Sequence, residues 1–483
     1  MVFSSITFLY FFLPIVLVLY AITSPRFRNL TLLCTSLFFY AWGEGFYVLV
    51  MLLSILTNYL IGIGISRASS PHKSKTTLAV GITINLSLLG LFKYSNFIVD
   101  NFNTLISIFN ISPFFLEPVH LPIGISFFTF QAISYLIDLH RQEVQEQKNI
   151  IDLGLYIALF PQLIAGPIVR YHDIATQLRS RITNLTIFSS GVRRFLYGLA
   201  KKVLIANPMG QIADTVYSLP QNELTLALTW LGTIAFAIQI YFDFSGYSDM
   251  AIGLGRMFGF NFLENFNYPY ISKSIQEFWL RWHISLSSWF RDYLYIPLGG
   301  SRRGTVRTHL NLLIVFTTCG FWHGASWNYV IFGLFHGIFL ILERGNYGTF
   351  LARLPKLVQF LITMIILQIG FVIFRSETIP LTINFLHTMF DFTNTFNDSY
   401  HLSNLLDNKA KTELLVGIVL SLPVYKAITE HISKRIDSAR YPKNNLLLIS
   451  STLTEIIILI TITYLTVITL ASGAYNPFIY FRF

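Results

Sequence analysis

Two histidines surrounded by aromatic and apolar residues are the groups in this sequence best suited to chemistry. His323 lies in Gly320-Phe321-Trp322-His323-Gly324, and His283 lies forty positions upstream in Trp279-Leu280-Arg281-Trp282-His283. An ionisable side chain in a membrane-like stretch is costly unless a partner or a function requires it. Because an imidazole accepts a proton near neutral pH, both residues are candidates for general acid–base catalysis.

His283 belongs to residues 274–293, which the pattern predicts to be one helix. With 3.6 residues per turn, Trp279 and His283 share one stripe, and Trp282 lies on a neighbouring aromatic stripe. His283 is then the one ionisable group on an aromatic face, where it could accept a proton. A histidine that only packs and bonds to a nearby carbonyl group would give the same pattern, so both interpretations stay open.

His323 belongs to an apolar stretch that follows a basic loop. If its helix starts directly after that loop, His323 lies about 22 Å along it, past the middle of a hydrocarbon core about 30 Å thick. Gly320 and Gly324 have the spacing that lets helices pack closely. His336 follows thirteen residues later, about 220° round one continuous helix. We therefore predict a turn at residues 324–326, without which His336 would point away from His323.

The composition places these residues in a polytopic membrane protein. The 483 residues are 53% hydrophobic and 12% charged, with a mean hydropathy of +0.57, whereas a soluble domain has about 25% charged residues. Apolar runs of about 20 residues recur along the chain, so we predict an all-α fold of about eleven transmembrane helices plus re-entrant or interfacial helices. The sequence predicts one membrane domain over residues 1–483, with its catalytic core at about residues 120–345.

The positive charge follows membrane topology. The net charge of +10 is spread over short loops between apolar runs, which argues for anionic headgroups and against nucleic acid as the partner. Basic loops near residues 26–28, 67–75 and 291–307 are predicted to be cytoplasmic, which places the N-terminus outside the cytoplasm. Cys34 and Cys319 lie in apolar runs without ligand spacing, so the sequence predicts neither a disulfide nor a metal site.

Two carboxylates lie near a predicted junction between helices at residues 224–241 and 245–258. Placing the carboxylates of Asp243 and Asp249 inside a membrane is costly in free energy unless each of them caps a helix or pairs with a cation. Asp243 could cap the second of these helices, and this structural role is preferred over a catalytic one. The basic stretch at residues 170–202 is predicted to lie along the cytoplasmic face as an interfacial amphipathic helix.

Several motifs in the sequence resemble the membrane-bound O-acyltransferase (MBOAT) family and, within it, the alginate O-acetylation branch. The motifs that carry this resemblance occupy residues 160–167, 239–251, 264–270, 289–300, 321–325 and 478–483. The similarity runs nearly from end to end, and this set of motifs is highly specific. Leu280 is a small departure, because the branch usually has a second arginine there. That change should alter surface charge and leave the chemistry intact.

The resemblance implies transfer of an acetyl group from cytoplasmic acetyl-CoA towards hydroxyl groups of an extracytoplasmic polysaccharide such as alginate. The histidine of the family's Trp-His-Gly motif maps onto His323, and the family's upstream polar catalytic residue maps onto His283. Under this interpretation His323 is the general base, while His283 orients the substrate or stabilises the oxyanion. Acetyl-CoA is the acyl donor, and no permanently bound cofactor is expected.

Other residues could support this chemistry. The possible supporting residues are Asp243, Asp249, Trp282 and His336. The arginines that could hold the phosphates of coenzyme A at the cytoplasmic mouth are Arg291, Arg302, Arg303 and Arg307. Positive-inside topology accounts for the same arginines equally well, so both interpretations stay open.

The resemblance also implies a location and partners. We expect a multi-pass protein of the bacterial inner membrane, working with a periplasmic acetyl acceptor or an SGNH-type acetyltransferase that completes transfer onto the polysaccharide. Peptidoglycan or a teichoic-type polymer is an alternative acceptor. A proton-coupled transporter would also use buried histidines and carboxylates, but it would favour inverted repeats that this sequence does not show. A noncatalytic scaffold would tolerate loss of both histidines.

Overall fold

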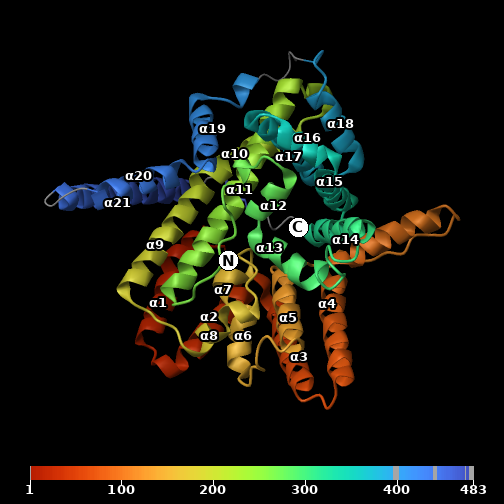
Figure 1. The fold of residues 1–483 in the computed structure, drawn as a ribbon, viewed down its shortest axis with the longest axis vertical. Helices are drawn as coiled ribbons and strands as arrows, with labels where there is room; N and C mark the ends of the chain where they lie inside the picture. The colour runs from red at the N-terminus through yellow and green to blue at the C-terminus, as the bar shows by residue number, and fades with distance from the viewer. Residues whose placement is uncertain (1, 395–401, 439–442, 474, 478–483) are drawn as a thin grey trace.

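The computed structural model describes residues 2–394, 402–438, 443–473 and 475–477, and it shows a chain built from helices (Figure 1). No β-strand forms within these residues, so the predicted all-α class is confirmed. The motif at residues 478–483 lies outside the described residues.

The first third of the chain forms a bundle of helices that is drawn in red to yellow in Figure 1. Its elements are η1 (Phe8–Phe12), α1 (Leu13–Ile22), η2 (Pro25–Phe27), α2 (Arg28–Glu44), η3 (Gly45–Tyr47), α3 (Val48–Ser66), α4 (Pro71–Ser107), α5 (Ile125–His140), α6 (Ile150–Ala158), α7 (Phe160–Leu163) and α8 (Tyr171–Arg179).

The middle of the chain supplies the helices that carry the candidate catalytic residues. Its elements are α9 (Leu185–Ala200), η4 (Lys201–Ala206), α10 (Asn207–Ser218), η5 (Gln221–Glu223), α11 (Leu226–Met257), η6 (Pro269–Ile271), α12 (Ile275–Arg281), α13 (Ile284–Phe290), η7 (Arg291–Tyr295), α14 (Thr305–His323) and α15 (Trp327–Arg344).

The last part of the chain ends in a pair of helices that extend away from the body as an arm (Figure 1). Its elements are α16 (Asn346–Arg353), α17 (Lys356–Arg375), α18 (Ile379–Met389), η8 (Leu402–Asn404), α19 (Asn408–Ser421), α20 (Val424–Ser438) and α21 (Lys443–Ala471).

Some of these helices are long and apolar enough to cross a membrane. Among the described residues five stretches qualify, and the bent pair α19–α20 could form a sixth span. The five are Pro25–Ser66, Pro71–Ser107, Leu226–Met257, Lys356–Arg375 and Asn445–Ala471. The predicted number of about eleven spans is larger than this, because it also counts helices that are shorter or more polar. The most apolar window of α11 is 78% buried and that of α21 is 0% buried, so α11 lies in the core while α21 leaves its apolar side chains for lipid.

Helix α11 is one continuous helix of 32 residues packed against α9. The sequence predicted two helices with a junction at Asp243, and that prediction is wrong. The two helix backbones touch at glycines, since a Cβ atom on Gly198 would lie 2.5 Å from the carbonyl oxygen of Gly246. This close contact brings basic side chains of α9 and η4 within reach of the carboxylates in the middle of α11. The ion pairs that form offset the cost of burying those carboxylates.

Helices α14 and α15 form a tight antiparallel hairpin. Helix α14 ends at His323 and α15 begins at Trp327, so the predicted turn at residues 324–326 is confirmed. A Cβ atom on Gly320 would overlap the carbonyl oxygen of Tyr329. Glycine is therefore required where the two helices cross. This contact fixes the position of the end of α14, which carries His323, relative to α15.

Candidate active site

His323 is the last residue of α14, and its ring lies between two cavities. The larger of these holds about 330 Å³ and is lined also by residues of α4 and of the segment that leads into α5. The smaller holds about 20 Å³ among aromatic rings. Phe374 makes an edge-to-face contact with the His323 ring at 5.3 Å. Within the described part of the chain no hydrogen bond reaches the imidazole, so both ring nitrogens remain available to a substrate.

His336 lies in the same small cavity as His323. The turn between α14 and α15 brings the second histidine back, and both rings line the 20 Å³ space. The His336 ring packs against Phe332 at 4.6 Å and Trp279 at 5.3 Å. Its Nδ1 atom has no hydrogen-bond partner among the described residues. Trp282, another residue that the sequence singled out, lines this cavity as well.

A much larger cavity of about 1270 Å³ lies beside the one that His323 faces. The two share Lys93 and Leu121 in their walls. Gly324, the residue after the catalytic candidate, also lines the larger cavity. The space near His323 is therefore wide enough for a sugar unit or a segment of a partner protein.

His283 lies at a break between α12 and α13, and the single helix predicted for residues 274–293 is wrong. The backbone of His283 adopts the left-handed conformation with φ 44° and ψ 54°, which a helix cannot contain. The main-chain N–H of Ile284 donates to the carbonyl oxygen of Asn265 at 2.9 Å and stabilises the break. The break turns a fully buried imidazole inward.

The Asn265 side chain determines which nitrogen of His283 carries the proton. Asn265 Oδ1 accepts the main-chain N–H of Ser285 at 3.1 Å and the Ser285 hydroxyl at 2.9 Å. Since a main-chain N–H can only donate, the atom facing His283 Nδ1 at 3.1 Å is an acceptor, and Nδ1 must be the protonated nitrogen. His283 Nε2 then presents a lone pair, and it is buried without a partner among the described residues.

The structure brings the two predicted catalytic histidines to one place. The indole ring of Trp322 lies 5.2 Å from the His323 ring and 6.2 Å from the His283 ring. The two imidazoles are also close enough to interact electrostatically. Phe244 of α11 closes the other side of His283 with an edge-to-face contact at 4.5 Å. His323 lines an open cavity and His283 is buried beside it among aromatic rings, an arrangement that suits proton transfer away from bulk water.

The sequence profile of the membrane-bound O-acyltransferase family matches residues 34–386. The chain belongs to this family. The probable alginate O-acetylase AlgI of Pseudomonas aeruginosa is 44% identical over 422 residues, which are 87% of this chain and 81% of that protein. The protein of the same name from Pseudomonas putida is 41% identical over 500 residues, which cover both chains completely. The peptidoglycan O-acetyltransferase of Helicobacter pylori is 35% identical over 426 residues, which are 80% of each chain.

The family and its fold class agree with the motifs found in the sequence. The chain is an acyltransferase and a multi-pass membrane protein. Membership of this family separates it from the transporter and scaffold classes that the sequence composition left open.

The two carboxylates of α11 are bound in ion pairs in this acyltransferase. Asp243 pairs with Lys202 of η4 at 2.8 Å, and Asp249 pairs with Lys201 at 2.6 Å and with Arg194 of α9 at 2.6 Å. The predicted helix cap at Asp243 is wrong, because the helix continues through that position. The paired cations come from a stretch predicted to lie at the membrane interface, but here they neutralise carboxylates of the core.

The arginines predicted to hold coenzyme A lie in η7, in the loop that follows it and in the first turn of α14. Arg291 pairs with Asp292 at 2.7 Å, and Asp292 also accepts a bond from Arg170 at 2.7 Å. Arg302, Arg303 and Arg307 are exposed. The loop places cations at the end of α14 opposite His323, about 27 Å away along the helix axis. Their role in binding coenzyme A stays a prediction.

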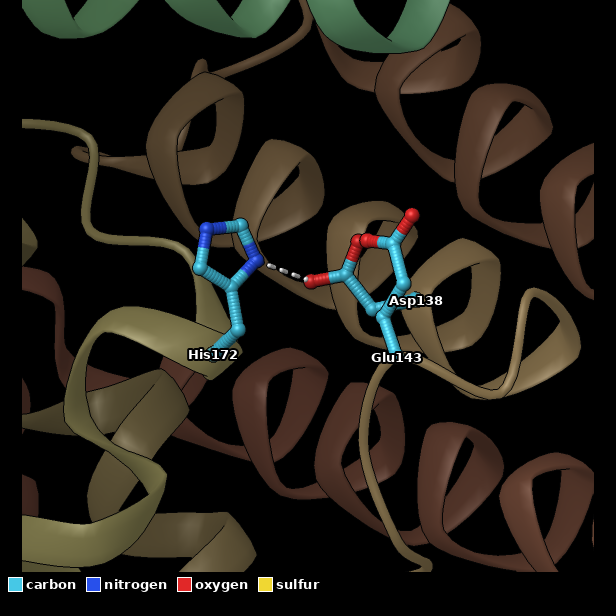
Figure 2. A group of neighbouring side chains, drawn as sticks. All are labelled: Asp138, Glu143 and His172. Carbon is cyan, nitrogen blue, oxygen red and sulfur yellow. Dashed lines mark hydrogen bonds and ion pairs between the residues drawn. The ribbon is translucent and has the colours of Figure 1, made fainter.

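A further cluster of ionisable groups lies where α5, α8 and η7 meet. Figure 2 shows Asp138, Glu143 and His172, whose ligand-type atoms all lie within 4.8 Å of one another, as a metal ion would require. Asp138 is already occupied, since it accepts bonds from His172 Nδ1 at 2.8 Å and from the Tyr293 hydroxyl at 2.7 Å. The bond to Asp138, with a second bond to Asp173, raises the pKa of His172 to about 9. Asp138 and His172 thus form an ion pair between helices near neutral pH.

Sequence reasoning missed three residues that shape the active site. Lys93 and Tyr94 of α4 donate to carbonyl groups in the last turn of α14, and Asn265 sets the proton of His283. Lys93 directly follows the apolar run at residues 77–92, and a lone cation at that place was an available signal. Asn265 lies inside a family motif, but its contact with His283 depends on a helix break that periodicity did not reveal.

Proposed function

We propose that this acyltransferase moves an acetyl group from acetyl-CoA to hydroxyl groups of a polysaccharide outside the cytoplasm. The names of its relatives support acetyl transfer to a cell-envelope polysaccharide, and the alginate relatives match over most or all of the chain. One observation carries the proposal. The His323 ring faces a cavity, no hydrogen bond from a described residue competes for it, and it lies beside a second histidine whose Nε2 atom has no partner among those residues.

His323 acts as the general base in this proposal. A hydroxyl group attacks the thioester carbonyl carbon only when its proton is removed, and the open imidazole takes that proton. The new C–O bond forms as the C–S bond breaks, and His323 returns the proton to the departing sulfur. The products are the acetyl ester and the free thiol of coenzyme A. The aromatic walls keep water from the thioester, so hydrolysis does not compete.

His283 orients the hydroxyl group in this proposal. Two roles were expected for it, orienting the substrate and stabilising the oxyanion. Stabilising an oxyanion needs a donor, and the Nε2 atom of His283 carries a lone pair because Asn265 holds the proton on Nδ1. The same lone pair accepts a hydrogen bond from a hydroxyl group and directs its oxygen. The tautomer therefore favours the first role.

The donor and the acceptor enter from opposite faces in this proposal. The segment at residues 291–307 runs from η7 into the first turn of α14 and carries the four arginines proposed for the phosphates of coenzyme A, while the cavities lie near the other end of that helix. If the basic loop is cytoplasmic, the N-terminus lies outside the cytoplasm and the cavities open towards the periplasm of a bacterial inner membrane. A periplasmic acetyl acceptor or an SGNH-type acetyltransferase would then complete the transfer.

Peptidoglycan is the second candidate acceptor. The relative from Helicobacter pylori is named as a peptidoglycan O-acetyltransferase, and it aligns with 80% of this chain. Both candidate polymers offer sugar hydroxyl groups to the same base, so the chemistry at His323 does not distinguish them.

The test uses purified full-length protein in lipid nanodiscs with radiolabelled acetyl-CoA. Mannuronate oligosaccharides and soluble peptidoglycan fragments are supplied in separate reactions, each with and without a periplasmic extract of the source cells. We expect label in one polysaccharide fraction together with release of free thiol, and loss of both with His323→Ala. Release of no thiol and transfer of no label to any hydroxyl acceptor or partner protein would overturn the proposal.

A further inference from the structure

Lys93 of α4 lies where the two larger cavities meet. Its side chain lines both the 1270 Å³ cavity and the 330 Å³ cavity that His323 faces. It interacts electrostatically with the His323 imidazole. A cation at this position is in the path of any group that reaches His323 from the wider cavity.

The contacts of Lys93 fix the end of the helix that carries His323. Its ammonium group donates to the carbonyl oxygen of Trp322 and, at 3.2 Å, to the hydroxyl of Ser126. The neighbouring Tyr94 hydroxyl donates to the carbonyl oxygen of Phe321 at 2.9 Å. The last carbonyl groups of a helix have no partner within it, and a cation is favourable at that end. Two consecutive residues of α4 therefore satisfy the last turn of α14.

The ammonium group of Lys93 lies 5.6 Å from the centre of the Trp322 ring, and no described carboxylate pairs with it. Lys202 and Lys201 are each paired with a carboxylate of α11, at 2.8 Å and 2.6 Å, whereas Lys93 forms no ion pair with any described residue. An ammonium group has three N–H donors, and two of those on Lys93 are used. A partly buried cation without a counter-charge is costly in the absence of a ligand. One N–H and a charge without a carboxylate partner among the described residues thus remain for a group in the cavity.

We propose that Lys93 is a catalytic residue, which donates its remaining N–H to the acetyl carbonyl oxygen as negative charge develops there. This proposal rests on the proposed function. When the hydroxyl oxygen bonds to the carbonyl carbon, the C=O bond becomes a C–O⁻ single bond and His323 holds the hydroxyl proton. Lys93 stays an ammonium ion throughout. The C=O bond re-forms as the C–S bond breaks and the sulfur takes the proton from His323.

The tautomer of His283 means that this residue does not supply the donor. With its proton on Nδ1, His283 presents a lone pair to the site and cannot donate from Nε2. A charged donor in a site with little water stabilises an oxyanion more strongly than a neutral donor does. The ammonium group of Lys93 is such a charged donor, and it is held in place by Trp322 and Ser126 before the substrate binds.

The decisive experiment compares Lys93→Met with Tyr94→Phe. Both variants remove one side-chain bond to the last turn of α14, but only the first removes the charge. We expect Lys93→Met to lower kcat for thiol release about 100-fold while the KM for acetyl-CoA stays within about twofold. Tyr94→Phe should keep kcat within about threefold of the wild-type value, because the charge is retained. Lys93→Arg should restore part of the lost rate, since it keeps a cationic donor.

Two results would overturn the role of Lys93 alone. One is a Lys93→Met protein with more than a third of the wild-type kcat while His323→Ala is inactive. The other is a Tyr94→Phe protein that loses as much rate as Lys93→Met, which would mean that both residues only cap the helix. If Lys93→Met does not fold, Lys93→Gln replaces it, and near-wild-type kcat with glutamine contradicts the proposal equally. A wild-type protein that transfers no acetyl group would overturn this proposal and the proposed function together.

Discussion

The two histidines of the active site differ in how the fold holds them. His283 is fully buried at a helix break, and its ring is tied to Asn265, which is itself tied to Ser285. His323 projects from a helix end, lines two cavities and has aromatic neighbours in place of hydrogen-bond partners. One imidazole therefore has a fixed proton and a fixed direction, while the other can exchange its proton with a substrate. In the proposed function this difference separates two tasks, since His283 orients the hydroxyl group and His323 removes its proton.

Removing the open imidazole should have the largest effect. We expect His323→Ala to lower acetyl transfer by about 10³-fold or more, because a positioned general base contributes about 10²–10⁴-fold. Label transfer from acetyl-CoA in nanodiscs measures the loss. His140→Ala is a suitable control, since His140 bonds to Ser74 and lines neither cavity next to His323. A His323→Ala protein that keeps a tenth of the wild-type rate would contradict the comparison.

Replacing the fixed imidazole should have a smaller and more selective effect. We expect His283→Ala to lower kcat about 100-fold, since the hydroxyl group loses an acceptor that orients it. His283→Asn should be less damaging, because its side-chain oxygen can also accept a hydrogen bond. Steady-state thiol release gives both values. Equal activities for the alanine and asparagine variants would show that His283 contributes packing and not an acceptor.

Asn265→Ala tests the origin of the difference between the histidines. Without the Asn265 oxygen the His283 proton is free to move to Nε2, so we expect a loss in kcat of about tenfold with His323 still essential. The buried main-chain N–H of Ser285 also loses its partner, which should destabilise the protein by about 1–3 kcal/mol. Comparing kcat with the thermal unfolding midpoint separates the two effects. Unchanged kcat in a destabilised protein would refute control of the tautomer by Asn265.

The smallest effect is expected at a histidine outside the active site. His172 has its pKa raised from 6.5 to about 9 by Asp138 and Asp173. Since the folded state binds this proton more tightly, its stabilisation is complete below about pH 6.5 and is lost as the pH rises through 9. We expect the unfolding temperature to fall over that range in the wild-type protein and less in His172→Gln, with acetyl transfer nearly unchanged. Parallel pH profiles of the two proteins would contradict the ion pair seen in Figure 2.

Local patterns in the sequence predicted part of the site correctly. The angular position of His336 relative to His323 required a turn between them, and the structure has that turn. The carboxylates of α11 misled the prediction, because Asp243 looked like a helix end although its charge is matched by Lys202, forty-one positions away. Periodicity cannot reveal partners so distant in the chain, and it cannot reveal the left-handed backbone of His283 either. An ion pair between helices decided the first feature, and hydrogen bonds to Asn265 decided the second.

The small cavity next to His323 is too narrow and too apolar to admit hydrated ions. It holds about 20 Å³, which is room for about one water molecule, and its walls are mostly aromatic rings. A hydrated ion would have to shed its water to enter such a space, at a large cost in free energy. A continuous chain of hydrogen-bonded water molecules, which could carry protons, does not fit in this small cavity either. If the acetyl donor and the acceptor reach His323 from opposite faces, as in the proposed function, this narrow aromatic space restricts the passage of ions and protons beside the catalytic base.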